Sequence, residues 1–149
     1  MQVEGVKHFE RLFRLAASLD IDRSDVRRLA AFVNQKLHDM LVVAVAHAKA
    51  NGGDVIQPHD LPITKGFQER IHEFRKYEVA VALEPVLEML ATLPPLELAY
   101  AVEVEEKLPE ITGGLTVALA HAFKILDPDL KNPRSEHWER IEKLFDLLF

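Results

Sequence analysis

The chain has 149 residues, no cysteine, and 18 Lys and Arg against 24 Asp and Glu, which gives a formal net charge of −6. This length suits one globular domain that buries a core of its own, so residues 1–149 are expected to form a single domain. The lack of cysteine excludes a disulfide framework, a thiolate zinc site and a cysteine nucleophile.

The first part of the chain predicts a short helix followed by a long one. Apolar residues recur at the i, i+3, i+4 spacing of a helical face over residues 9–17 and again over residues 26–48. Asp22 or Ser24 is placed to accept a hydrogen bond from the free amides at the start of the long helix. The Asn-Gly-Gly sequence at 51–53 is expected to end it, because glycine readily adopts the left-handed conformation of a helix C-terminus.

A third, shorter helix is predicted after an extended segment at residues 55–57, which is too brief for an independent strand. The apolar face of this helix covers residues 63–74. Its start has two interpretations, because Pro58 suits the first position of a helix whereas Pro62 would remove an interior hydrogen bond. We expect the regular helix to begin near Asp60.

The second part of the chain predicts the same order of elements. Pro85 lies in the first turn of a short helix that Pro94-Pro95 ends, since proline cannot continue a helix. A long amphipathic stretch follows at residues 98–126. Pro109 and Gly113-Gly114 lie inside this stretch and predict a kink or a close helix crossing.

The last helix is predicted from a new start signal after Asp127-Pro128. Asn132 suits the cap of this helix and Pro133 its first position. Its apolar face consists of Trp138, Ile141, Phe145 and Leu148. The chain therefore predicts two consecutive triplets, each made of a short, a long and a short helix.

The two triplets are related by a repeat of about 75 residues. The Ala-His-Ala sequence at 46–48, for example, recurs at 120–122. We predict a duplication whose halves are residues 1–76 and 77–149. The first half holds 12 Lys and Arg against 10 Asp and Glu, and the second holds 6 against 14, so the acidic excess lies in the second half.

Residues 48–61, with the sequence AKANGGDVIQPHDL, resemble a segment of the archaeal histones. There too a glycine turn after the long helix leads into a short β-like loop and then into an Asp followed by an aliphatic residue. Two such triplets in one chain resemble a small, uncharacterised bacterial family whose members fuse two histone folds into a pseudodimer. Similar connecting segments are LPITKG at 61–66, LPPL at 93–96, LDP at 126–128 and KNP at 131–133.

This resemblance implies an all-α protein with a tandem duplicated histone fold, packed as an intramolecular handshake pseudodimer. In such a handshake the two long helices cross antiparallel, and the first loop of each half pairs with the second loop of the other. The physical argument agrees, because a three-helix half alone leaves the wide apolar face of its long helix uncovered.

One of the two loop edges departs from the DNA-binding pattern of archaeal histones. Where those usually carry an Arg, a Lys and a Thr after the glycine, and a further Lys before the last helix, this chain has Gly53, Asp54, Val55 and Gln57. Asp60 is retained without its usual Arg partner. The pairing loop at 94–98 offers no cation and adds Glu97. We therefore expect this edge not to bind DNA.

The opposite loop edge joins five cations and is the candidate site for DNA phosphates. We call it the basic edge; it consists of Arg23, Arg27 and Arg28 at the start of the first long helix, with Lys131 and Arg134 from the last loop. Four acidic residues accompany them, namely Asp20, Asp22, Asp25 and Asp129. The alternative is therefore a mixed solvated edge with surface ion pairs of about 0–1 kcal/mol each.

Nothing in the chain predicts catalysis or a metal site. Glu69-x-x-His72 is a lone example of a spacing that helical diiron proteins use in pairs, and the histidines do not form the zinc-protease pattern. The serines, at 18, 24 and 135, lie in no nucleophile elbow. His47 and His121 are expected to pack or hydrogen-bond between helices, with a metal site or a pH switch as the alternative. We expect no cofactor, no metal and no enzymatic activity.

Two classes of function stay open. The first is a non-enzymatic histone-fold architectural or interaction protein, at most weakly bound to DNA, whose partner is another protein or its own copy. The second is a bacterial histone-like nucleoid protein that binds DNA non-specifically through the basic edge. The chain shows no signal-peptide pattern and no uninterrupted apolar run long enough for a membrane span. We therefore expect a cytoplasmic location, at the nucleoid in the second case, with no membrane partner and no small-molecule substrate.

Overall fold

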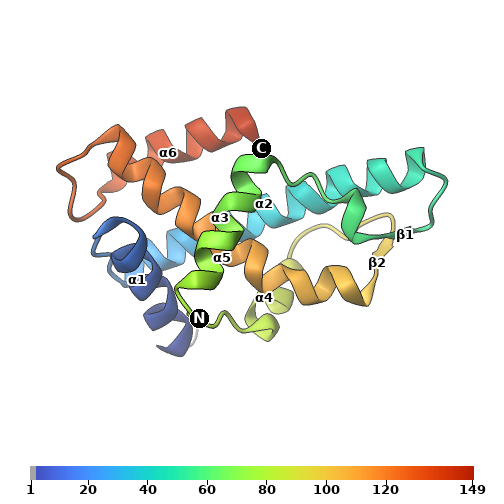
Figure 1. Cartoon of the computed structure of the whole chain (residues 1–149), viewed down its shortest axis with the longest axis horizontal. Coiled ribbons are helices and arrows are strands. Elements are labelled where there is room, and N and C mark those ends of the chain that lie inside the picture. The colour runs from blue at the N-terminus through green and yellow to red at the C-terminus, as the bar shows by residue number, and fades with distance from the viewer. Residues whose placement is uncertain (1–2) are drawn as a thin grey trace.

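A computed structural model describes residues 3–149 and is mostly helical. Its α-helices are α1 (Val3–Ala17), α2 (Arg23–Ala50), α3 (Lys65–Lys76), α4 (Leu83–Leu90), α5 (Val102–Leu126) and α6 (Ser135–Leu148). Two short strands, β1 (Val55–Ile56) and β2 (Ala99–Tyr100), form a parallel pair. The predicted helical class is confirmed, and the short–long–short order of lengths recurs along the chain (Figure 1).

The long helix α2 begins and ends where the sequence predicts. Asp22 is its N-cap, because its side chain accepts a hydrogen bond from the backbone N–H of Asp25 at 2.9 Å. At the other end Asn51 is the C-cap, and Gly52 takes a φ of +76°, the left-handed conformation that favours glycine. By length and composition alone α2 is apolar enough to cross a membrane, but 61% of its most apolar stretch is buried inside the protein, as in a core helix.

The two long helices cross, and they run in opposite directions (Figure 1). Helix α3 lies across α5 at the glycine pair. A Cβ added at Gly113 would lie 2.3 Å from ring carbons of Phe74, and one added at Gly114 would lie 2.7 Å from Cγ1 of Ile71. The predicted close crossing is thus confirmed, with α3 as the partner, and α5 stays helical through Pro109.

Loops from distant parts of the chain pair at both ends of the molecule. At one end β1 pairs with β2 in the register Val55↔Ala99 and Ile56↔Tyr100. At the other end the backbone N–H of Asp20 donates to the backbone oxygen of Lys131 at 2.8 Å. Each pairing joins a loop of residues 1–76 to a loop of residues 77–149.

The core draws side chains from both parts of the chain. Trp138 of α6, Phe13 of α1 and Phe123 of α5 are almost wholly buried against one another. The Trp138 ring centroid lies 4.9 Å from that of Phe123, in an edge-on arrangement, and 6.5 Å from that of Phe13. Helices far apart in sequence therefore share one core.

The start of the third helix differs from the prediction. A 3₁₀ turn covers Pro58–Asp60, and α3 begins only at Lys65 rather than near Asp60. Pro62 lies between the two and lacks the N–H that an uninterrupted helix would need. Thr64 restarts the helix, because its hydroxyl oxygen accepts from the backbone N–H of Phe67 at 3.2 Å.

The last helix also begins later than predicted. Helix α6 starts at Ser135, so Asn132 and Pro133 lie in the preceding loop and not at its cap and first position. The cap is built from a side chain within the helix, since Nδ1 of His137 accepts from the backbone N–H of Arg134 at 3.0 Å. Leu148, predicted as part of the apolar face, is 75% exposed near the end of α6.

Candidate nucleic-acid interface

The basic edge lies where α2 begins and the loop at 127–134 ends. The hydrogen bond between Asp20 and Lys131 holds the two segments together. Arg23, Arg27, Lys131 and Arg134 are exposed, and Arg28 is partly buried. The structure therefore brings together the two groups of cations that the sequence assigned to one edge.

Two of the five cations are already paired with carboxylates. The Nε atom of Arg28 donates to Oε1 of Glu142 at 2.7 Å, and this hydrogen bond raises the pKa of Arg28 above its ordinary value. Arg134 forms an exposed pair with Glu136 at 3.3 Å. Within residues 3–149, Arg23, Arg27 and Lys131 form no ion pair, so they are the cations open to an anionic partner.

Asp25, which the sequence placed among the competing charges, lies in the interior instead. Its Oδ1 accepts from Nε1 of Trp138 at 2.9 Å, and its Oδ2 accepts from the backbone N–H of Asp22 at 3.0 Å. Burial raises the pKa of Asp25, although both hydrogen bonds oppose that shift. This carboxylate fixes the start of α2 against α6 and does not face an approaching phosphate.

The loop at 127–134 is held by two contacts that the sequence analysis did not predict. Lys124 donates from Nζ to the backbone oxygen of Leu130 at 2.7 Å. His137 is buried, with its Nε2 lying 3.4 Å from Oδ2 of Asp127. Helical spacing carries no signal for either contact, because both link a helix to an irregular loop.

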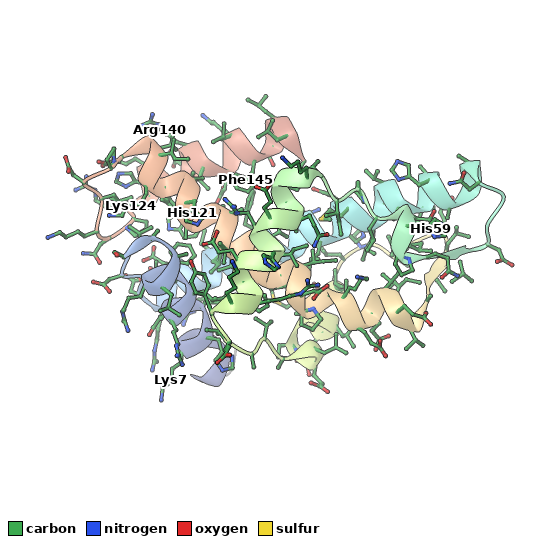
Figure 2. All side chains as sticks on the ribbon, viewed as in Figure 1. Lys7, His59, His121, Lys124, Arg140 and Phe145 are labelled. Atoms are coloured by element: carbon green, nitrogen blue, oxygen red, sulfur yellow. The ribbon has the colours of Figure 1, made fainter. Side chains whose placement is uncertain are left out.

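Further cations surround this end of the molecule. Figure 2 shows Lys124 near the end of α5 and Arg140 on the outer side of α6. Arg14 of α1 lies 3.6 Å from Asp20 in an exposed pair. The positive surface therefore extends beyond the five predicted residues, with carboxylates interspersed.

The opposite loop edge is acidic or paired, as the sequence indicates. Asp54 is exposed, and Lys49 is held by Glu97 across the loop pairing. Asp60 is 2% exposed; its Oδ2 accepts from the backbone N–H of Gln57 at 2.8 Å, whereas its Oδ1 has no hydrogen-bond partner among the described residues. No unpaired cation of residues 51–60 or 94–98 is available for DNA at this edge.

Both repeated histidines hydrogen-bond to a neighbouring element, as predicted. Nδ1 of His47 lies 2.8 Å from the backbone oxygen of Asp60, and Nε2 of His121 lies 2.7 Å from Oε2 of Glu73. In the part of the chain that the structure describes, no group of three or more His, Asp and Glu side chains is arranged to hold a metal ion.

Glu73 is the centre of a polar cluster between α3 and α5. The hydroxyl of Tyr77 donates to its Oε2 at 2.5 Å, beside the contact from His121. Burial acts to raise the pKa of Glu73, but the hydrogen bonds from Tyr77 and His121 outweigh it and leave the pKa lowered. Burial, reinforced by the Glu73 carboxylate, raises the pKa of Tyr77 to about 12.

The fold and the candidate site together define a small helical protein whose basic edge carries carboxylates among its cations. The chain belongs to a family described as a domain of unknown function (DUF1931), whose model matches residues 9–146. It is similar to a Thermus thermophilus protein of known crystal structure, with 53% identity, a TM-score of 0.94 and 97% of each chain covered.

Further matches come from Aquifex aeolicus. A 1.9 Å crystal structure of one protein from this organism matches with a TM-score of 0.83 and 27% identity, covering 97% of this chain and 95% of that one. An uncharacterised protein of strain VF5 is 27% identical over 149 residues, which are all of this chain and 86% of that protein. The two crystal structures show that the fold is shared, and the function is argued below from the residues.

Proposed function

We propose that the fold is a duplicated histone fold closed as an intramolecular handshake. Three observations support this: the repeated short–long–short helices, the antiparallel crossing of α2 and α5, and the pairing of loops at both ends. A handshake requires that the first loop of one half meet the second loop of the other. The β1–β2 pair and the Asp20–Lys131 hydrogen bond have this connectivity.

We propose that the protein is a non-enzymatic architectural or interaction protein. The observation that carries this function is the exposed apolar end of α6, where Leu147 is 81% and Leu148 is 75% exposed. Adjacent large apolar side chains at one end of a helix favour contact with a partner chain or a second copy. Leu144 and Phe149 extend the same apolar end.

The test is the assembly state of the full chain, measured by light scattering during size-exclusion chromatography and by co-purification at high salt. Leu147→Ser combined with Leu148→Ser is expected to abolish the self-association or the capture of the partner. Val42→Ser combined with Val102→Ser removes two exposed apolar side chains elsewhere and is the matched control. A native chain that is monomeric and captures no protein contradicts this function.

The basic edge supports a second function, weak and non-specific DNA binding. Three cations without an ion pair among the described residues, Arg23, Arg27 and Lys131, flank the start of a long helix, where phosphate is favoured. Three phosphate contacts correspond to a slope of about −3 in a plot of log affinity against log salt concentration. Because the opposite edge has no free cation among residues 51–60 and 94–98, such binding does not wrap the duplex.

A band-shift titration at low salt tests this second function. Arg27→Glu combined with Lys131→Glu is expected to abolish retardation of a short duplex. Lys65→Glu combined with Lys76→Glu changes the net charge equally on α3 and is expected to change binding only slightly. Retardation that survives the first pair, or that is absent for the native chain, rules out the basic edge as a DNA site.

A further inference from the structure

A groove lies between α2, α4 and the segment that leads to α5. Its volume is about 540 Å³, within the range of about 300–1,000 Å³ that is typical of small-molecule sites. Five leucines form its apolar wall, namely Leu41, Leu87, Leu90, Leu96 and Leu98. The groove meets α2 near its middle, at His38 and Leu41, whereas the basic edge lies at the start of α2 and the exposed apolar residues lie at the end of α6.

The walls of this groove are fixed by hydrogen bonds. His38 of α2 contacts the backbone oxygen of Pro94 at 2.7 Å through its Nε2, which must donate because a carbonyl oxygen only accepts. On the far side Tyr100 pairs with Ile56 in the parallel sheet, and the next residue, Ala101, donates to the backbone oxygen of Ile56 at 2.9 Å. The groove is therefore preformed, and a ligand does not need to order it.

The formal charge carried by the lining of the groove is negative. Glu105 is the charged residue among those lining it, and among the described side chains its carboxylate forms no hydrogen bond or ion pair. The hydroxyl of Tyr100, also in the lining, has no hydrogen-bond partner there either. Burial, and to a lesser extent the charge of Glu105, raises the pKa of Tyr100, so its phenol stays neutral.

We propose that this groove binds a small amine with an apolar body, the ammonium group pairing with Glu105 and the apolar body lying against the leucines. An unpaired carboxylate beside a leucine wall is complementary to a cation that carries hydrocarbon. The Tyr100 oxygen accepts a hydrogen bond from the same ammonium group, whose three donors exceed what one carboxylate uses. The amine is a ligand and not a substrate.

The experiment compares two probes of equal shape on the full-length protein. Cyclohexylmethylamine and cyclohexylmethanol are titrated at neutral pH, and amide chemical shifts are followed by NMR. We expect shifts centred on α4, on residues 94–105 and on the part of α2 around His38 and Leu41, with about twofold to fivefold tighter binding of the amine, as for one exposed ion pair. Equal affinities, shifts centred elsewhere, or no binding of the amine overturn the proposal.

Three variants separate the charge from the cavity. Glu105→Gln is expected to abolish the preference for the amine and to leave binding of the alcohol unchanged. Glu106→Gln, which removes the same charge from an exposed neighbour outside the groove, is expected to keep the preference. Ala91→Trp fills the groove and is expected to abolish binding of both probes. Identical effects of the two glutamine variants, or full binding by Ala91→Trp, contradict the site.

Discussion

A few polar side chains link one helix to another, and the Asp25–Trp138 pair is an example. The Asp25 carboxylate accepts from the backbone N–H of Asp22, the N-cap of α2, and also from the indole of Trp138 in α6, so one residue serves both the local and the tertiary structure. Removing a buried acceptor leaves its donors unsatisfied, which costs about 1–3 kcal/mol. We place this pair among the main contacts between the start of α2 and α6.

The raised pKa of Asp25 predicts a pH-dependent contribution to stability. The folded state holds the proton more tightly than the unfolded state, so the contribution is complete below the unfolded pKa and is lost as the pH rises through the folded pKa. The stability advantage of the native chain over Asp25→Asn is therefore expected to be larger near about pH 3 than near about pH 7. Urea unfolding followed by fluorescence of Trp138, the single tryptophan, measures it. An advantage that grows with pH contradicts the burial of this carboxylate.

Tyr77 gives a second prediction at the residue scale. Burial and the Glu73 carboxylate raise its pKa to about 12, so the folded state loses stability as the pH rises from 10.0 through that value. In a Tyr100→Phe background the absorbance of tyrosinate reports Tyr77 alone, because the chain has two tyrosines. Glu73→Gln is expected to lower this pKa, though not to the ordinary value, since the burial remains.

Glu110→Gln is the matched control for the Tyr77 titration. This carboxylate pairs with Arg75 at 2.7 Å and makes no contact with Tyr77 among the described side chains. It is expected to leave the titration of Tyr77 unchanged. If the Tyr100→Phe protein titrates identically with and without Glu73→Gln, the Glu73 carboxylate does not raise the pKa of Tyr77.

The basic edge shows which positions and contacts of single residues can be predicted from the sequence. The helix boundaries predicted from periodicity and the handshake implied by the resemblance to histone folds placed the α2 arginines and the last loop at the same edge, and in the structure these segments do lie together. They did not indicate that Arg28 is paired with Glu142 or that Asp25 is internal. Those contacts depend on how α6 packs on α2, and nothing in either segment alone specifies that packing.

At the scale of elements, the crossing of α3 and α5 depends on two residues without side chains. Alanine is the better helix former, but at Gly113 its Cβ would meet the Phe74 ring and at Gly114 the side chain and backbone of Ile71. Overpacking of this kind costs about 1–3 kcal/mol. The glycines therefore serve the approach of two helices and not a turn.

Gly113→Ala and Gly114→Ala are each expected to lower the free energy of unfolding by about 1–3 kcal/mol. Gly66→Ala is the control, because nothing lies within 4 Å of a Cβ there and α3 should gain up to about 1 kcal/mol. Thermal unfolding by circular dichroism compares the three variants. If all three alanine variants change the free energy of unfolding in the same direction, the close approach of α3 to α5 does not explain the destabilisation at Gly113 and Gly114.

Helix interiors were predictable here, whereas the starts of α3, α5 and α6 were not. The interiors follow from apolar periodicity, and the end of α2 follows from glycine chemistry. The starts of α3 and α6 depended on which of several polar residues near a proline became the cap. Thr64 and His137 took that role, and choosing them requires knowing where the preceding loop is anchored.

At the scale of the whole molecule, the proposed handshake makes each half depend on the other. Residues 1–76 and 77–149, expressed separately, are expected to lack a cooperative thermal transition, because α2 and α5 then lose their apolar partner faces. Mixing the two fragments is expected to restore the transition and the buried environment of Trp138. A cooperative transition of either fragment alone contradicts the interdependence.

The loop and helix pairings also bear on how fast the chain folds. Contacts such as Asp20 with Lys131, Asp25 with Trp138, and Arg28 with Glu142 join residues more than one hundred positions apart. Helical proteins usually fold quickly because their contacts are local, whereas contacts between distant residues slow the search. During synthesis the apolar face of α2 stays uncovered until α5 and α6 have been made. We therefore expect slower folding than in a simple helix bundle of the same length, with a longer period in which the nascent chain depends on chaperones.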